Sequence, residues 1–356
     1  MVDIDPQTAF SLIKVLLLGA VAFIVSILFT PFLTNFLYKN KLWKKTSRTT
    51  SIDGKEMPVF KKFHSEKETK VPRFGGLLIW IVPPVLAVLF FIFSELDGTI
   101  MDKLNFLSRS QTWLPLFAMV AASLVGLLDD ILQVRGKGKY TGGGLSLKYR
   151  LGSVFLIGLI GGWWFFAKLG WTTLHIPGAG DISMGIWYIP FFVFIMLAVY
   201  SGGVIDGIDG LAGGSFATIF GAFSVIAIFT GQIDLAAFCA VLAGTILAFL
   251  WFNIPPARFY MGESATMGLC TAITVVAFLT DSVLVLPIIG ILLVAESGSV
   301  IVQLLSKKFF KRKIFIATPI HYHFEAKGWP HYKITMRFWV IGLIAAVIGI
   351  AIRLLG

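Results

Sequence analysis

The sequence has little charge for its length. Only 14% of its 356 residues are Asp, Glu, Lys or Arg, whereas about a quarter of a typical soluble domain is charged. Hydrophobic residues make up 57% of the chain, and they fall in blocks long enough to cross a hydrocarbon core, which takes roughly 20 residues per helix. This composition excludes an ordinary soluble globular protein and indicates an integral membrane protein.

Cysteine is also scarce. The chain has two, Cys239 and Cys270, and both lie in apolar segments. This excludes a disulfide framework and a cysteine-based metal site, so we expect both to be small buried hydrophobic residues. Internal repeats and low-complexity linkers are absent as well. We therefore expect a single polytopic domain over residues 1–356.

Ten apolar segments have the length of a membrane span. In lipid only a helix satisfies its backbone hydrogen bonds within one segment, so the sequence predicts an all-α membrane protein of about ten transmembrane helices. The expected spans are residues 10–38, 75–94, 112–132, 151–169, 186–205, 213–230, 234–254, 265–280, 283–305 and 337–355.

The positive charge is distributed unevenly. A net charge of +11 is compatible with a nucleic-acid partner, but in a membrane protein it follows from the excess of Lys and Arg in cytoplasmic loops. Twenty-five of the thirty basic residues lie in loops of one side, in segments 39–74, 133–150, 255–264 and 306–337. We therefore expect these loops in the cytoplasm, both termini outside and no nucleic acid. The outer loop 170–185 has the glycine and proline of a short hairpin.

Four polar clusters remain, all on the predicted cytoplasmic side. Solvated helix caps are the simplest explanation, but carboxylates at a membrane boundary without basic neighbours are costly and usually functional. Five carboxylates facing one site would repel each other, and a divalent cation removes that penalty. Oxygen-only ligands favour Mg²⁺. The clusters are Asp129-Asp130, Asp206 with Asp209, the segment from Asn253 to Glu263, and His321-Tyr322-His323-Phe324-Glu325.

The histidines allow a second interpretation, a zinc site. Without cysteines or a third nearby ligand we consider zinc at His321 and His323 the weaker alternative, because histidines next to Lys and Arg suit a diphosphate better. We expect His175 and His331 to be structural. His64, in the basic loop, can be either structural or functional. Carboxylates for Mg²⁺, cationic loops for phosphate and a lipid-facing body together predict phosphoryl transfer between a soluble diphosphate donor and a lipid phosphate.

Four motifs in this order resemble a known family. They are the Asp129-Asp130 pair, DGIDGLAGG from Asp206, FLWFN ending at Asn253, and PIHYHFEAKGW from Pro319. The sequence resembles the polyprenyl-phosphate N-acetylhexosamine-1-phosphate transferases over nearly its whole length. Among them it is most similar to the phospho-N-acetylmuramoyl-pentapeptide transferases, the MraY translocases, because of the His-x-His-Phe-Glu run.

The resemblance implies a reaction of peptidoglycan precursor synthesis. UDP-MurNAc-pentapeptide and undecaprenyl phosphate would give lipid I and UMP, with Mg²⁺ required, in the inner membrane of a bacterium. It also implies catalytic roles, with Asp129 as the base that deprotonates the lipid phosphate. The implied catalytic residues are Asp129, Asp130, Asp209, His321 and His323, and the implied metal ligands are Asp129, Asp130, Asp209 and Glu263.

The resemblance further implies substrate contacts, and several of them depart from the family pattern. Glu263 stands where the family has an aspartate, Arg150 where it has a lysine, and Tyr260 where it has a stacking phenylalanine. Tyr200 and Gly203 replace two asparagines. The implied substrate-binding residues are Lys67 or Lys70 for phosphate, Arg150, Asp206, Asn253 and Tyr260.

Other functions remain open from the sequence. The loop KVPRFGG at residues 70–76 is closer to the branch that transfers GlcNAc-1-phosphate, which makes that activity the alternative within the same class. A transporter would carry charges along a path through the bilayer, and Glu296 is the one clear carboxylate in the middle of an expected span. An inactive relative kept for binding is the third class. The oligomeric state, a homodimer included, is left open.

Overall fold

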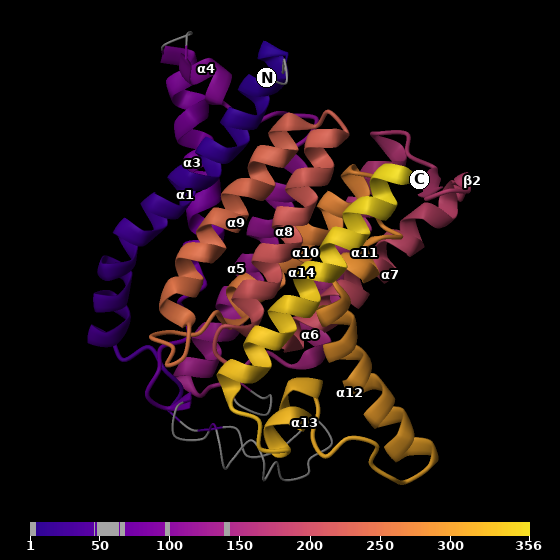
Figure 1. The fold of residues 1–356 in the computed structure, drawn as a ribbon. Helices are drawn as coiled ribbons and strands as arrows, with labels where there is room; N and C mark the ends of the chain where they lie inside the picture. The colour runs from indigo at the N-terminus through magenta and orange to yellow at the C-terminus, as the bar shows by residue number, and fades with distance from the viewer. Residues whose placement is uncertain (1–4, 46, 48–63, 65–67, 97–99, 139–142) are drawn as a thin grey trace.

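The chain forms a bundle of long helices with one small hairpin, in a computed structural model that describes residues 5–45, 47, 64, 68–96, 100–138 and 143–356 (Figure 1). The expected all-α multi-pass membrane fold is confirmed. The elements are α1 (Pro6–Lys39), α3 (Leu77–Leu96), α4 (Ile100–Leu104), α5 (Trp113–Arg135), α6 (Leu147–Ala167), β1 (Thr173–Ile176), β2 (Gly180–Ser183), η1 (Gly185–Trp187), α7 (Tyr188–Ser201), η2 (Gly202–Ile205), α8 (Leu211–Phe229), α9 (Ile233–Asn253), α10 (Gly262–Leu279), α11 (Leu286–Ile289), α12 (Ile291–Phe309), α13 (Ile320–Ala326) and α14 (His331–Leu355).

Within the described part of the chain, nine helical segments are long and apolar enough to cross a membrane. They coincide with nine of the ten expected spans, apart from small differences at their ends. The remaining one, 283–305, is divided at Gly290 into the short α11 and the longer α12. α12 carries Glu296, Lys307 and Lys308, and it leaves the bundle at an angle (Figure 1). These charges distinguish it from the nine apolar spans.

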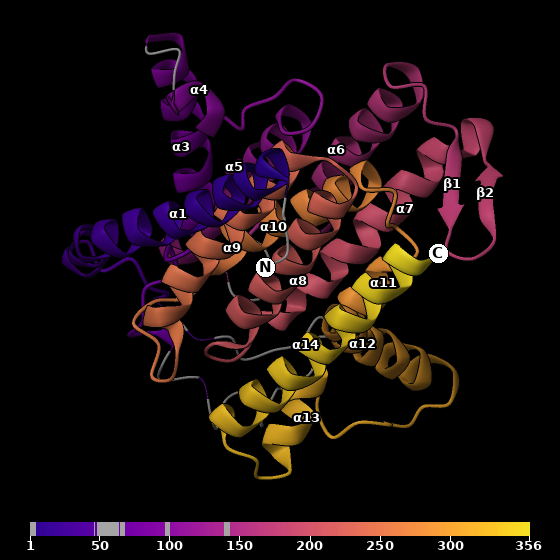
Figure 2. The ribbon, with the colours of Figure 1, turned by 45° about the horizontal axis from the view of Figure 1, so that its top comes forward.

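Helix α10 is the centre of the bundle. Every one of its residues except Glu263 is buried, and it packs on α5, α7, α3 and α8 in the middle of the bundle (Figure 2). Its close packing on α5 depends on small residues: a Cβ on Gly126 would lie 2.3 Å from the Glu263 carbonyl oxygen, and one on Gly268 would lie 2.0 Å from Ser123 Oγ. Small residues of this kind let helix backbones approach closely inside a membrane protein.

The two ends of the bundle differ in what they carry. The predicted hairpin is confirmed, because β1 and β2 pair antiparallel with His175 opposite Asp181. It lies beside the C-terminus, at the end of the bundle where both chain termini are found, and α13 lies at the opposite end (Figure 1). α1 and α12 end, and α3 begins, at the α13 end of the bundle (Figure 1).

The basic-residue asymmetry generates a test of orientation. We expect Ala179→Cys in the exposed hairpin to react with a membrane-impermeant thiol reagent in intact spheroplasts. Lys313→Cys, which is exposed at the other end of the bundle, should react after the membrane is permeabilised and not before. Background labelling is low because Cys239 and Cys270 are buried. Labelling of the Lys313→Cys protein in intact spheroplasts would contradict the predicted orientation.

Candidate active site

A cavity of about 550 Å³ lies at the α13 end of the bundle. Its wall combines the loop before α3 with residues from α6, α7, α10, α12 and α13, and it brings four carboxylates and several cationic side chains together. Such a mixture at a membrane boundary can bind phosphate groups and a cation. The charged residues that line it are Asp206, Asp209, Glu263, Glu68, Lys44, Arg73, Arg150 and Lys307.

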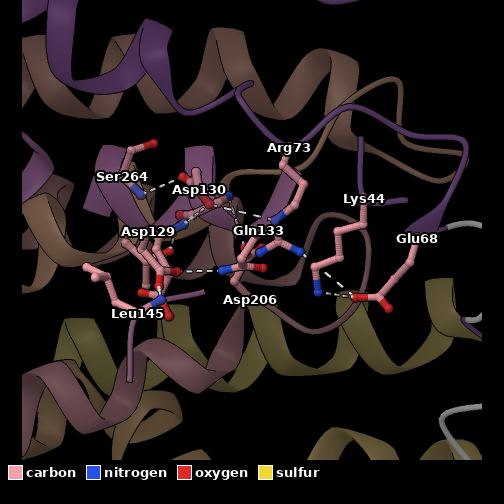
Figure 3. A network of polar contacts seen from close by, with 12 residues as sticks. Lys44, Glu68, Arg73, Asp129, Asp130, Gln133, Leu145, Asp206 and Ser264 are labelled. Carbon is pink, nitrogen blue, oxygen red and sulfur yellow. Dashed lines mark hydrogen bonds and ion pairs between the residues drawn. The ribbon is translucent and has the colours of Figure 1, made fainter. Parts of the chain in front are cut away.

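Asp130 connects α5 to the first turn of α10. Its fully buried carboxylate accepts the backbone N–H of Glu263 at 3.1 Å and that of Ser264 at 2.9 Å, and Arg73 Nε lies 3.7 Å from it (Figure 3). The first N–H groups of a helix have no partner within the helix, and the helix dipole favours negative charge there. Asp130 is therefore engaged in holding α10, and it does not line the cavity.

Asp129, its neighbour, holds a different segment. Its carboxylate accepts hydrogen bonds from Gln133 Nε2 and from the backbone N–H of Leu145, both at 2.5 Å (Figure 3). It is fully buried and is not part of the cavity wall. The two carboxylates are thus adjacent at one helix end, but Asp130 bonds to the start of α10 and Asp129 bonds to Leu145.

Asp206 and Asp209 follow η2 and do line the cavity. Asp206 accepts the N–H of Gly262 at 3.3 Å, and Asp209 accepts that of Ala257 at 3.2 Å. Burial raises the pKa of Asp206 to about 6, although the nearby Arg73 guanidinium opposes the shift. Burial therefore disfavours the charged form of this carboxylate, and a bound cation would stabilise it.

Asn253 completes the link between these two segments. Its side-chain oxygen accepts the N–H of Gly210 at 2.9 Å, and its amide donates to the carbonyl of Phe259 at 2.8 Å. Tyr260, which the resemblance assigns to the uridine pocket, lines the same cavity, and burial raises the pKa of its phenol. Asn253 therefore shapes the loop that presents Tyr260 as well as lining the cavity itself.

Two of the positions that depart from the family pattern contact each other. Arg150 Nη1 and the carboxylate of Glu263 form an ion pair, and both side chains line the cavity. α6 begins at Leu147, so Arg150 lies inside a helix and is held at a fixed position. The longer carboxylate and the larger cation are thus matched partners across α6 and α10.

The histidines of the fourth motif do not meet in one place. His321 Nδ1 lies 2.8 Å from Glu296 Oε2, and both side chains are fully buried. Its Nε2 faces the loop between the two aspartates, since a Cβ on Gly207 would lie 2.2 Å from it. His323 points elsewhere: its Nδ1 accepts the N–H of Ile316 at 3.2 Å. Burial and the positive charge of Lys327 lower its pKa, and it does not line the cavity.

The loop before α3 supplies residues that sequence reasoning did not identify. Lys44 and Glu68 form an ion pair of 2.7 Å, and Arg73 Nη1 lies 3.9 Å from the same carboxylate. The sequence carried a signal, because Arg73 lies two residues before the Gly75-Gly76 pair. The N–H groups of that pair bond to the carbonyls of Tyr260 and Met261 at 3.0 Å. Of the expected phosphate lysines, Lys70 is exposed and outside the cavity wall, and Lys67 lies outside the described residues.

The expected metal ligands do not converge on one point. Among the described residues, three ligand atoms lie within 4.8 Å of one another in His64, Glu325 and His331, and in His175, Asp181 and Asp281, but not in any three of the expected carboxylates. Of the carboxylates in the polar motifs, Asp206, Asp209 and Glu263 face the cavity. This all-oxygen set fits Mg²⁺, which needs one or two carboxylates and keeps waters or substrate phosphates as its other ligands.

The comparisons agree with the motifs. The model of glycosyl transferase family 4 matches residues 112–281. A phospho-N-acetylmuramoyl-pentapeptide-transferase of Geobacillus sp. (strain WCH70) is 32% identical over 336 residues, which cover 93% of this chain and 95% of that protein. One of Geobacillus kaustophilus is 34% identical over 94% of this chain and 96% of its own length, and one of Chloroflexus aurantiacus is 30% identical over 96% and 90%.

The buried contact between Arg73 and Asp130 generates a stability prediction. We expect Asp130→Asn and Arg73→Gln each to lower the unfolding midpoint of the detergent-solubilised protein, because each leaves the other charge buried without its counter-charge. Their effects should not add, with a coupling energy of about 1–3 kcal/mol in a double-mutant cycle. Asp129→Asn with Arg73→Gln is the matched control and should show a smaller coupling. Additive effects in the first pair would contradict the assigned contact.

Proposed function

Because the chain belongs to the family of the phospho-N-acetylmuramoyl-pentapeptide-transferases, we propose that it transfers phospho-MurNAc-pentapeptide from UDP-MurNAc-pentapeptide to undecaprenyl phosphate. The products would be lipid I and UMP. One polytopic domain over residues 1–356 in the bacterial inner membrane, with its cavity on the cytoplasmic face, would carry out the reaction. The donor is soluble and the acceptor is a lipid, so the site must lie at the membrane boundary.

The observation that carries this proposal is the set of charges in one cavity. Arg73, Lys44 and Lys307 enter it from elements far apart in sequence, and Asp206 and Asp209 face them. Cationic side chains bind a diphosphate through charge-assisted hydrogen bonds. Phosphoryl transfer needs mainly positioning and charge stabilisation, which this arrangement supplies without a covalent nucleophile.

We propose that Asp209 and Glu263, with Asp206 beside them, hold Mg²⁺. When bound, the ion neutralises the negative charge of the diphosphate. Asp130 anchors the first turn of α10 under Glu263, and Asp129 anchors the segment at Leu145, so both of these residues position the site. A direct role of Asp129 as base requires substrate phosphate to replace its contacts with Gln133 and Leu145.

His321 is the other positioned group. Glu296 holds its Nδ1, and its Nε2 makes no hydrogen bond to another described residue although it is buried. A buried nitrogen without a partner is unfavourable, and this one is aimed at the loop of Asp206 and Asp209. We propose that Glu296 orients His321 so that its Nε2 stabilises that loop around the bound donor, while His323 contacts the sugar or peptide portion from the rim.

The identity of the sugar donor can be tested directly. We expect the purified protein with undecaprenyl phosphate to release UMP from UDP-MurNAc-pentapeptide and not from UDP-GlcNAc, because a site built to bind polar groups rejects a donor that lacks them. His323→Ala should reduce release from the muramyl donor while leaving the fold unchanged. Release from UDP-GlcNAc at an equal or greater rate would assign the protein to the GlcNAc-1-phosphate transferases.

The metal assignment rests on Glu263 and makes its own prediction. Activity should require Mg²⁺ and disappear with excess chelator. Glu263→Gln should reduce kcat by about 100-fold or more, as losses of key electrostatic groups commonly do, and should raise the Mg²⁺ concentration needed for half-maximal rate. Glu95→Gln, an exposed change at the far end of α3, is the control and should alter neither. An unchanged Mg²⁺ dependence in Glu263→Gln would remove Glu263 from the ligands.

A further inference from the structure

Three side chains of the kinds that bind metal ions meet away from the carboxylates assigned to Mg²⁺. His64 Nε2 lies 2.9 Å from one oxygen of Glu325, and His331 Nε2 contacts the other oxygen. The ligand atoms of all three lie within 4.8 Å of one another. The three come from the loop before α3, from α13 and from the start of α14. His331, which the sequence leaves as a structural residue, thus has a specific partner in Glu325.

This cluster is built into the protein. Glu325 is 2% exposed and His64 is 7% exposed. The two imidazole rings are nearly parallel, with centroids 5.3 Å apart and an interplanar angle of 8°, and His64 also contacts the ring of Tyr322 edge-on at 5.3 Å. A carboxylate and two histidines held in this way are not a solvated surface patch, because burying a carboxylate requires strong partners.

The geometry of the cluster favours a cation. The Nε2 atoms of His64 and His331 each contact one oxygen of Glu325, so two ring nitrogens and a carboxylate surround one point. A buried carboxylate is costly unless donors or positive charge lie beside it. The cluster can thus accept positive charge at the point where both Nε2 atoms and the carboxylate meet.

We propose that His64, Glu325 and His331 form a binding site for Zn²⁺, separate from the carboxylates assigned to Mg²⁺. Two imidazole nitrogens and one carboxylate oxygen are a ligand set that zinc accepts, with a water as the fourth ligand. Imidazole ligands suit zinc, whereas Mg²⁺ prefers oxygen ligands alone. The ion would take the place of the two Nε2 protons, which move to Nδ1 or to solvent.

The position of the site gives it a consequence for the cavity. His64 and Tyr322 both line the cavity, and Tyr322 donates a hydrogen bond from its hydroxyl to the carbonyl of Gly207 at 3.2 Å. Zinc would join the loop before α3 to α13 and α14 at the cavity wall. Its role is to fix the cavity wall, so its binding is independent of both substrates.

The test is a zinc titration of the full chain in detergent, with the affinity tag removed and the protein first stripped by chelator. Competition with a chromophoric chelator should give one tightly bound Zn²⁺ per chain, which a large excess of Mg²⁺ does not displace. His331→Gln should weaken binding at least 10-fold. His323→Gln, at a half-buried histidine outside the cluster, is the matched control and should bind as the unchanged protein does.

Two further measurements keep the test decisive. Co²⁺ in place of Zn²⁺ should give the visible absorption of a tetrahedral site, and zinc should raise the thermal midpoint of the unchanged protein but not that of His331→Gln. If His331→Gln does not fold, His64→Gln serves in its place. Equal zinc binding by the unchanged protein and both variants, or loss of binding in His323→Gln, would overturn the proposal. Substrates are absent throughout, so either result leaves the assignment of the transferase reaction to the UMP assay.

Discussion

The arrangement of this protein depends on how the first turn of α10 is satisfied. α10 runs through the middle of the bundle with no solvent along it, and its first backbone N–H groups need acceptors that lipid and apolar side chains cannot provide. Asp130 supplies two of them from α5. The charge that this buries is offset by Arg73, and that contact fixes the loop before α3 against the same point.

The same constraint explains why so few motif residues face the cavity. In the segment from residue 257 to 263, backbone N–H groups donate to the carboxylates of Asp206 and Asp209, and the carbonyl of Phe259 accepts from the side chain of Asn253. Each polar motif therefore uses part of its hydrogen-bonding capacity to hold another motif. The Asp206–Asp209 loop, Glu263 and the cations still line the cavity, together with Asn253 and Tyr260. A site held in this way is rigid before substrate arrives, which lowers the cost of ordering it.

Two of the departures that the resemblance implies have a structural explanation. A glutamate in place of an aspartate reaches farther from α10, and Arg150 on α6 meets it with its planar guanidinium. Because the two changes contact each other, neither leaves a buried charge alone. The ion pair also draws Glu263 towards α6, so the separation between this carboxylate and Asp209 is set by two helices rather than by one side chain.

The sequence by itself determined the helices, the hairpin and the general character of the site. Long apolar runs must be helices in lipid, and carboxylates beside them at a boundary must be functional or paired, so the spans and the aspartate motifs were readable from residue types alone. It could not determine which motif residues reach the cavity. Helix periodicity does not say that Asp130 caps α10, that His323 turns away from His321, or that His64 meets Glu325 and His331. The contacts of Asp130 with α10 and of His64 with Glu325 join residues 133 and 261 positions apart, and only the packing of the bundle decides them.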